Sequence, residues 1–598
     1  MSFSNWRTRP EDAAPSLIDV AIGRTPADLV LRDCRLVNVN TREIEGHIDV
    51  AIRKDRVALV GDASHTVGPK TTIIDVKGRF VTPGLIDSHM HIESSMVTPT
   101  QFARAVLPLG TTAVFVDPHE MGNVMGLDGI KYMIKESLAL PLKVFFTIPS
   151  CVPALPGFET AGASIGPEDV KRVLKWPNVV ALGEMMNFPG VLNGDRAVME
   201  EIKATLGRGM PIEGHSPGLA GKELSAYVAA GITSCHESTT KEEALEKLRR
   251  GMYLQAREGS AWLDVKENVR AVTETEVDPR HMLLVTDDRE PWSLIRQGHM
   301  NHVVRRAIEE GVDPLVAYQM ATINAAEHYE MGRYIGSVAP MRSADLLIMT
   351  SLDCAKPDVV IADGRIVAEG GRLTVDIEQK SPPERALNSI HLEHQPIRED
   401  FVVKAKNDGG RATVRAIKVM GGSVLTEEAV EEVPVKDGDV KASTEDDVLK
   451  AALIERHHAS GRMTVAFTKG FGFQSGAVAS TVAHDSHNLL VVGVDETDMA
   501  YAALELTENG GGMVAVKNKQ VLGMIRLPVA GLLSERPVEE VAAEAEVLLE
   551  AWRRLGCDMV EPFMTMSLMT LTVLPELRLS DRGLLDTKRF RFVEPLLN

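Results

Sequence analysis

Two histidines stand at the end of an apolar segment close to residue 90. Residues 81–95 read VTPGLIDSHMHIESS, so His89 and His91 follow the apolar run two positions apart. In an extended strand, side chains two residues apart point to the same side, and two imidazoles placed in this way are suited to hold a metal ion. Such a pair is more often incidental when it stands alone, so a metal site requires further ligands elsewhere in the chain.

Five further apolar runs also end in side chains that bind metals or exchange protons. They read TTAVFVDPHE, VVALGEMM, MPIEGHS, ITSCHES and HMLLVTDD. The polar residues at their ends are Asp117, His119, Glu120, Glu184, His215, His236, Asp287 and Asp288. One such ending would carry little weight, whereas six strand ends of this kind rarely arise by chance.

The elements that must position these residues alternate between strand and helix. From residue 84 to residue 334 we count eight strand–helix units, with helix starts and glycine stops between the apolar runs. Buried strands that alternate with helices predict a parallel sheet, and eight of them predict a TIM-like (β/α)8 barrel. The fold class is therefore α/β. In such a barrel, the polar strand ends meet at the face where active sites lie.

The flanking regions predict two further units. Residues 1–27 read as a polar lead-in, and residues 28–83 and 335–376 read as short antiparallel strands. We expect the two halves to join in one small β-sandwich with the barrel inserted between them. A charged linker then leads to residues 396–598, whose mixed strands and helices predict a C-terminal α+β domain.

Composition excludes several classes of protein. The 598 residues carry a net charge of −19, which argues against a nucleic-acid partner and an anionic membrane surface. No apolar run approaches the roughly 20 residues of a membrane span, and the first residues lack the apolar core of a secretory signal. The five cysteines form no CxxC pair, so neither a disulfide framework nor a thiolate zinc site is indicated. We expect a cytoplasmic protein.

The strand-end residues together indicate a pair of metal ions. Four imidazoles and one carboxylate need an additional anionic ligand to hold two cations close together, and Glu184 stands where that bridge would come from. Mixed nitrogen and oxygen ligation suits zinc, iron or manganese. Two such ions bring the pKa of a shared water toward neutrality and so produce a hydroxide nucleophile. With Asp287 as general base, the expected chemistry is metal-assisted hydrolysis.

The motifs resemble those of the amidohydrolase superfamily. The resemblance rests on PGLIDSHMHIESS, on the order of histidines and aspartates along the barrel, and on the return ATINAA…IGSVAPMRSADLLIM. Many members of that superfamily carry a carboxylated lysine on the fourth strand, where this chain has Glu184. With Glu184 in that place, the chain differs from the dihydroorotase, hydantoinase and urease type.

A closer similarity is to the bacterial adenine deaminases, over nearly the whole chain. It rests on HMHIESS, VFVDPHE, LGEMMNFPGV, EGHSPGL, SCHES, REGS and VTDDREP, and on the C-terminal GFGFQSGAVASTVAHDSHNLLVVG. The resemblance implies hydrolysis of adenine to hypoxanthine and ammonia by hydroxide attack at C6. It also implies two divalent metal ions per subunit, with manganese as the first choice and iron or zinc as alternatives. Barrels of this kind commonly form homo-oligomers.

The resemblance assigns roles to individual residues. The expected metal ligands are His89, His91, Glu184, His215, His236 and Asp287. The expected catalytic residues are Asp287, Glu184, Glu120 and His119. The expected substrate-binding residues are Glu93, Asp117, Arg257 and Asp288. Glu120 is the first choice for the acid that protonates the purine ring, ahead of Glu93 and Glu184, and Asp288 is an alternative to Asp287 as ligand.

Some alternatives stay open at this point. Another deaminase or a cyclic-amide hydrolase of the same superfamily would carry similar motifs, and a non-catalytic scaffold relative is a further possibility. His484-Asp485-Ser486-His487 has ligand-like spacing in the last domain. These side chains fit a second metal site, the cap of a loop, or a segment that closes over the mouth of the barrel.

Overall fold

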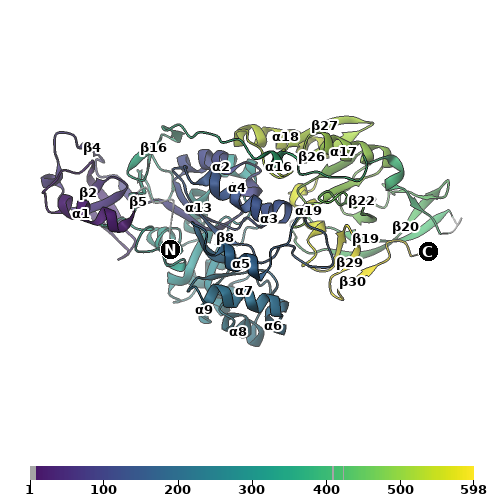
Figure 1. Ribbon diagram of the computed structural model, residues 1–598, viewed down its shortest axis with the longest axis horizontal. Helices are drawn as coiled ribbons and strands as arrows, with labels where there is room; N and C mark the ends of the chain where they lie inside the picture. Colours follow the sequence, from purple (N-terminus) through teal and green to yellow (C-terminus); the bar gives the residue numbers. More distant parts are fainter. Residues whose placement is uncertain (1–7, 407–409, 422, 598) are drawn as a thin grey trace.

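The computed structural model describes residues 8–406, 410–421 and 423–597. The molecule is elongated, with the N-terminal sheet at one end, the barrel in the middle and the C-terminal domain at the other end (Figure 1). Among the described helices, none is both long and apolar enough to cross a membrane.

The predicted (β/α)8 barrel is confirmed. Five parallel strands form one sheet and three form another, and hydrogen bonds join the two at both seams. At one seam the Thr233 N–H donates to the Ile212 carbonyl (2.9 Å), and at the other the Asp287 N–H donates to the His89 carbonyl (3.2 Å). In chain order the strands are β6 (Leu85–Met90), β7 (Thr111–Val116), β8 (Lys143–Ile148), β9 (Val179–Met185), β10 (Ile212–Gly214), β11 (Ser234–Cys235), β12 (Tyr253–Arg257) and β13 (Met282–Val285).

Burial explains why these segments form a parallel barrel. Every residue of β6, β7, β8 and β9 is buried, as expected for strands covered on both faces. Helices surround them, and several begin at a residue whose side chain accepts the free N–H groups of the first turn, such as Asp195, Thr240 and Asp313. The main covering helices are α2 (Pro99–Val106), α4 (Leu127–Ser137), α5 (Pro167–Val173), α7 (Arg196–Leu206), α8 (Gly221–Ala229), α9 (Lys241–Arg249), α13 (Met300–Glu309) and α14 (Pro314–Met320).

The strands on either side of the barrel form one nine-stranded sheet. They are β1 (Leu29–Asn38), β2 (Glu43–Arg53), β3 (Arg56–Gly61), β4 (Thr72–Asp75), β5 (Phe80–Pro83), β14 (Leu346–Met349), β15 (Val359–Ala362), β16 (Arg365–Glu369) and β17 (Arg372–Leu373). Antiparallel pairing of β5 with β14 joins the two halves, with Val81 opposite Ile348.

The expected sandwich is a single sheet that folds back on itself. Val57 in the edge strand β3 exchanges backbone hydrogen bonds with residues 341 and 342, just before β14. One face of the curled sheet encloses its own apolar core. The lead-in contains helix α1 (Pro10–Ala21), whose Leu17 and Val20 pack on the other face of the sheet.

The C-terminal region contains a ten-stranded sheet and a separate three-stranded sheet. The ten strands are β18 (Val403–Lys404), β19 (Arg411–Lys418), β20 (Glu427–Lys436), β21 (Asp439–Val440), β22 (Val448–Ile454), β23 (Met463–Lys469), β24 (Ala477–Ser480), β25 (Leu489–Gly493), β26 (Gly512–Lys517) and β27 (Gln520–Arg526). The other three are β28 (Leu577–Ser580), β29 (Gly583–Asp586) and β30 (Arg591–Val593). The principal helices are α17 (Glu496–Glu508), α18 (Val538–Leu555) and α19 (Pro562–Ser567).

The C-terminal region is fastened to the rim of the barrel. The Thr98 N–H donates to the Ser534 carbonyl (3.0 Å), and the Asn488 side chain donates to the Thr160 carbonyl (2.8 Å). The predicted linker also packs against the barrel, since Gln379 contacts Gln101 (3.0 Å). Apolar residues of both units belong to one continuous core. This packing places C-terminal side chains at the mouth of the barrel.

Candidate metal centre and active site

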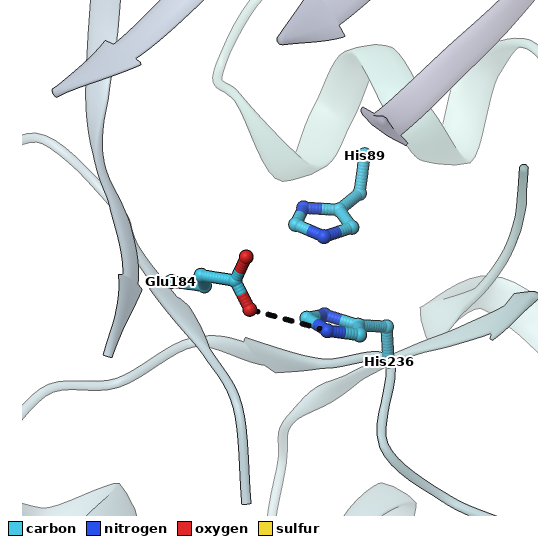
Figure 2. A group of neighbouring side chains, drawn as sticks. All are labelled: His89, Glu184 and His236. Carbon is cyan, nitrogen blue, oxygen red and sulfur yellow. Dashed lines mark ion pairs between the residues drawn. The ribbon is translucent and has the colours of Figure 1, made fainter. Parts of the chain in front are cut away.

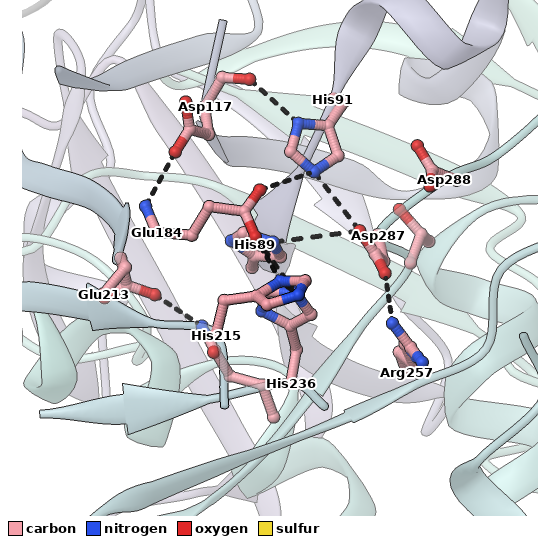
Figure 3. A network of polar contacts seen from close by, with 12 residues as sticks. His89, His91, Asp117, Glu184, Glu213, His215, His236, Arg257, Asp287 and Asp288 are labelled. Atoms are coloured by element: carbon pink, nitrogen blue, oxygen red, sulfur yellow. Dashed lines mark hydrogen bonds and ion pairs between the residues drawn. The ribbon is translucent and has the colours of Figure 1, made fainter. Parts of the chain in front are cut away.

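The six residues predicted to bind metal lie together at the carboxyl ends of the barrel strands (Figure 3). They are contributed by β6 and the residue that follows it, by β9, and by the residues just after β10, β11 and β13: His89, His91, Glu184, His215, His236 and Asp287. All are buried except His215, which is partly buried. Residues almost 200 positions apart therefore form one cluster.

Glu184 lies between two groups of imidazoles. Its Oε2 is 2.7 Å from His215 Nδ1 and 3.3 Å from His236 Nε2, a contact that Figure 2 shows. Its Oε1 is 3.6 Å from His91 Nε2 and 3.4 Å from His119 Nδ1. The two oxygens of one carboxylate thus face different histidines, as a ligand bridging two cations must do.

Asp287 faces the two histidines at the end of β6, His89 and His91. Its Oδ1 is 3.2 Å from His91 Nε2 and 3.8 Å from His89 Nε2. Its backbone adopts a left-handed conformation (φ 58°), which aspartate tolerates better than most residues, and it forms a bridge with Met90 of β6. This turn directs the carboxylate toward the histidines of the neighbouring strand.

The donor set fits a pair of divalent cations. Three groups of side chains bring their ligand atoms within 4.8 Å of one another around Glu184 and Asp287, among them His89–Glu184–His236 and His89–His91–Asp287. His89 Nε2, which faces Asp287, is buried without a hydrogen-bond partner among the described residues. Buried polar atoms normally have a partner, and a cation would provide one for this nitrogen.

Hydrogen bonds orient the ligands. His91 Nδ1 lies 2.9 Å from the Asp117 carbonyl, which places its proton there and leaves Nε2 free to ligate. The Asp117 carboxylate in turn accepts the N–H of Glu184 (2.9 Å). Tyr227 accepts the N–H of His215 (3.0 Å) and donates to the Met185 carbonyl (2.8 Å). These contacts fix the rings and carboxylates before any ligand binds.

The electrostatic environment keeps both carboxylates of the cluster anionic and His89 neutral. Burial raises the pKa of Glu184, but hydrogen bonds from His215 and His236 outweigh it and hold that pKa well below its usual value. The pKa of Asp287 is likewise lowered despite burial, by His236, His91 and Arg257. Burial, together with the neighbouring His236, lowers the pKa of His89 to about 4. Anionic carboxylates and a neutral His89 are the forms that ligate metals.

Arg257 binds three carboxylates, one of which belongs to Asp287 of the cluster. It donates to Asp287 Oδ2 (3.0 Å), to Glu237 Oε1 (2.5 Å) and to Asp264 Oδ2 (2.7 Å). Burial lowers the pKa of the guanidinium, but these three carboxylates outweigh it and raise the pKa well above its usual value. Arg257 therefore lies in the cavity wall with its charge already matched by protein carboxylates.

A cavity of about 410 Å³ opens directly above the cluster, a size typical of small-molecule sites. Of the predicted catalytic and substrate-binding residues, His119, Glu120, Arg257 and Asp288 line it together with most of the ligands. Apolar side chains form much of the remaining wall, and the C-terminal region supplies many of them: Val424, Leu425, Leu568, Leu571, Val573 and Leu574.

Two predicted substrate-binding residues do not line this cavity. Asp117 lies beneath it, with its carboxylate on the Glu184 N–H. Glu93 is also buried, and its Oε1 accepts the N–H of Met121 (3.2 Å). It borders a small separate void of about 20 Å³, enough for roughly one water. Both acids stand behind residues that do line the cavity.

Sequence reasoning missed Glu237 in the cavity wall, and it named Asp485 only as a member of the segment His484–His487. Glu237 follows His236 directly, just as Asp288 follows Asp287, and this repeated pattern was a usable signal. Asp485 follows His484 in that segment, one of whose expected roles was to close over the mouth of the barrel, and both side chains line the cavity. Asp485 comes from the C-terminal region, so only its packing on the barrel brings it to the site.

Comparisons with known proteins agree with the geometry. The amidohydrolase family matches residues 80–367, and the adenine deaminase C-terminal domain matches residues 423–591. The chain is 53% identical to the adenine deaminase of Moorella thermoacetica, over 97% of each chain. It is 47% identical to an adenine deaminase of Clostridium botulinum (strain Langeland), over 99% of each chain.

Among solved structures, a beta-aspartyl dipeptidase from Fervidobacterium islandicum is similar at 16% identity, with a TM-score of 0.45 over 58% of this chain and 100% of that chain. In this chain the two matched family regions follow one another, the amidohydrolase region first and the adenine deaminase C-terminal domain second. The chain belongs to the adenine deaminase family, within the amidohydrolases.

Proposed function

We propose that this protein hydrolyses adenine to hypoxanthine and ammonia at a binuclear metal centre. The carrying observation is the placement of Glu184, whose two carboxylate oxygens face different histidines at the base of an enclosed cavity. Membership of the adenine deaminase family directs the substrate assignment to adenine. A glutamate bridge needs no modified lysine, which separates this site from the cyclic-amide hydrolases considered at the outset.

The proposed ligands form two groups that share Glu184. His89, His91 and Asp287 belong to one group, and His215 and His236 to the other. Two divalent cations bound there would supply a water acidic enough to attack as hydroxide near neutral pH. His119 also approaches Glu184 Oε1 (3.4 Å), so we assign it to the wall beside the first group, in contact with the substrate.

Asp287 is the proposed general base. Arg257 holds its Oδ2, which leaves the carboxylate fixed in one orientation, and its lowered pKa keeps it in the anionic form that a general base requires. It would take the proton of the attacking water and return it to the departing amino group, which leaves as ammonia. Asp288 lies in the cavity wall, where its Oδ1 accepts a hydrogen bond from Ser94, and we propose that it contacts the substrate.

Glu120 is the proposed acid that protonates the purine ring. Burial raises the pKa of its carboxyl, and the neighbouring His484 and His119 oppose that rise without cancelling it. A raised pKa favours the protonated form, which can donate to the ring nitrogen next to C6 as negative charge develops there. Glu120 lines the cavity, at the start of α3 (His119–Met125).

The remaining predicted residues receive positioning roles in this proposal. Asp117 orients Glu184 and His91, Glu93 holds the N–H of Met121 directly after Glu120, and Arg257 orients Asp287. Asp117 and Glu93 do not line the cavity, and Arg257 lines it with its guanidinium bonded to three carboxylates. The sequence predicted that Asp117, Glu93 and Arg257 contact the substrate. We propose instead that they position the residues that do so.

Manganese is the proposed metal, with iron or zinc as alternatives, since the ligands are nitrogen and oxygen atoms alone. We place the protein in a reducing cytoplasm, consistent with five cysteines that are all unpaired. A homo-oligomer is our expectation for the assembled enzyme, and light scattering of the metal-loaded protein would measure it.

Ammonia release from a panel of bases, combined with metal analysis of the same sample, tests the proposal. We expect release from adenine, much less from adenosine, and none from cytosine or guanine, with about two metal ions per chain. Release from cytosine or guanine but not from adenine would overturn the substrate assignment. Full activity in a sample shown to contain no metal would overturn the mechanism.

A further inference from the structure

One loop of the C-terminal region reaches into the cavity above the metal centre. It spans residues 481–488, between β24 and β25. Two of its side chains, His484 and Asp485, line the cavity, and both are buried. The proposed chemistry at the metal centre uses neither of them, so their presence in the wall calls for a role of its own.

The two side chains meet the barrel at residues that already have a function. His484 Nδ1 lies 3.3 Å from Glu120 Oε1 and 3.6 Å from Asp485 Oδ1. Asp485 Oδ1 lies 4.0 Å from His119 Nε2. A row of alternating imidazoles and carboxylates thus runs along one side of the cavity, half from the barrel and half from the C-terminal region.

The loop is held in place by its backbone. The His484 N–H donates to Ser567 Oγ (3.2 Å), and Thr570 Oγ1 donates to the His484 carbonyl (2.7 Å). Further along, His457 Nε2 lies 2.7 Å from the Ser486 carbonyl. Side chains on a backbone fixed in this way are set in position before a ligand arrives, which is the requirement for recognition.

A third metal ion is not the role that the contacts favour. Glu120, His484 and His487 lie close enough to suggest such a site. However, His487 Nδ1 accepts the N–H of Ala483 (3.2 Å), so the neutral ring carries its proton on Nε2 and has no lone pair there for a metal. Two ligands would remain, too few for a closed protein site.

Asp485 instead offers an acceptor that the protein does not use. Its Oδ2 is buried and has no hydrogen-bond partner among the described residues. A buried carboxylate oxygen in that state is costly, and a ligand that brings an N–H would relieve the cost. Adenine carries two kinds of N–H: the amino group at the reacting carbon, and the N–H of its five-membered ring.

We propose that Asp485 accepts the N–H of the five-membered ring of adenine, with His484 fixing its carboxylate, so that the C-terminal region forms part of the substrate site. The assignment rests on the proposed function, because it places the amino group of adenine at the metal centre. His119 lies between Glu184 and Asp485, 3.4 Å from the former and 4.0 Å from the latter, so a purine whose amino group is at the metal centre would extend its five-membered ring along this wall toward Asp485. Recognition of this N–H selects the free base over purines substituted on that ring.

The first test compares substrates on the wild-type, metal-loaded protein. Both 7-methyladenine and 9-methyladenine keep the amino group but lack the ring N–H. We expect their kcat/KM to be at least about 100-fold below that of adenine, since a site built to accept a hydrogen bond discriminates strongly against an analogue without the donor. This comparison needs no variant and does not depend on the folding of one. Equal kcat/KM for all three bases would overturn the proposal.

The second test uses Asp485→Asn, which keeps the shape of the side chain and removes its charge. We expect kcat/KM for adenine to fall by about 100-fold, chiefly through KM, with metal content unchanged. The loss for 9-methyladenine should be much smaller, so the preference for adenine collapses. Ser486→Ala, in the same loop but outside the cavity wall, is the matched control and should behave like the wild type.

The outcomes separate this proposal from the one on which it rests. Equal losses for adenine and 9-methyladenine in Asp485→Asn would show a structural role only and would overturn the inference. An unchanged KM for adenine would do the same. No ammonia release from adenine by the metal-loaded wild type would instead overturn the proposed function itself, and the inference would fall with it.

Discussion

Glu184 is the residue on which the chemistry of the site depends. Its two oxygens contact different histidines, and it is the ligand shared by both proposed cation positions. Replacing it with glutamine keeps the volume and removes the negative charge. An uncharged amide cannot hold two cations close to one another. We therefore expect the variant to lose the metal pair while it keeps its fold.

We therefore expect Glu184→Gln to bind fewer than two metal ions per chain and to lose at least about 1,000-fold in kcat. Metal analysis and ammonia release on the same preparation measure both quantities. Glu168→Gln, at an exposed glutamate on α5, is the control and should change neither. A Glu184→Gln protein with two metal ions and normal kcat would contradict the bridging role.

A substitution at Arg257 tests whether the orientation of Asp287 affects kcat independently of the positive charge beside it. Arg257→Lys retains one positive charge but cannot contact Asp287, Glu237 and Asp264 at the same time, as the guanidinium does. We expect kcat to fall by about 10- to 100-fold while KM for adenine changes little, since the substrate itself is not the partner. A rise in KM with normal kcat would indicate direct substrate contact instead.

Single residues were predictable from sequence where a strand end placed them. His89, His91, Glu184, His215 and His236 could be identified because each follows an apolar run of the barrel. The residues that contact and orient these ligands could not be identified in this way. The contact between Arg257 and Glu237 depends on how the ends of β11 and β12 align, and β11 has only two residues in register with β12. The residue pattern within one strand does not indicate how its end aligns with the end of the neighbouring strand.

At the scale of elements, helix α7 carries an acid that makes stability depend on pH. Glu201 is buried on this helix, and burial, reinforced by Asp195, raises the pKa of its carboxyl to about 8. The folded state therefore holds a proton that the unfolded chain releases near its ordinary pKa of 4.5. This contribution to stability is present at low pH and is lost as pH rises from about 4.5 to about 8.

Glu201→Gln should remove that dependence. At pH 5 we expect the variant and the wild type to melt at similar temperatures, and at pH 8 we expect the variant to melt several degrees higher, because it has no carboxylate to bury. Scanning calorimetry across this pH range measures the difference. Glu200→Gln, at the preceding position on the same helix, is the control, since its side chain is not buried. A difference that shrinks toward pH 8 would contradict the assignment.

Strand pairing explains why the predicted sandwich is one curled sheet. The alternating pattern of residues 28–83 and 335–376 predicted strands with one apolar face, and the two halves do share strands of one sheet. Whether such strands form two stacked sheets or one sheet that bends depends on twist and bulges. Register shifts occur within the pairing of β1 with β2, and bulges of this kind bend a sheet.

For the whole molecule, the active site is shared between two units of the chain. The barrel supplies the proposed ligands, whereas the C-terminal region supplies His484, Asp485 and much of the apolar wall. Sequence patterns predicted each unit separately but not their docking, because no motif records which surfaces meet. The C-terminal side chains in the cavity wall would displace water from around a bound purine.

Metal removal should therefore affect the entire molecule. The cations would be held by six side chains from five strands or strand ends, so their loss leaves several imidazoles and carboxylates buried without their partner. Ligands that bind only the folded state stabilise it by about 2.7 kcal/mol per site at 100 times the dissociation constant. For two sites in a chain of 598 residues that unfolds as one unit, we expect the melting temperature to fall by roughly 4 °C on chelation.

The shared core predicts how that loss spreads. Apolar residues of the barrel and of the C-terminal sheet belong to one cluster, so the two units should unfold together. Hydrogen exchange on the chelated protein should show lower protection in β22 and β25 as well as in β6 and β9, and manganese should restore it. Loss confined to the barrel would mean that the C-terminal region folds independently. In that case the loop carrying Asp485 would keep its shape without the metal, and substrate recognition could be separated from catalysis.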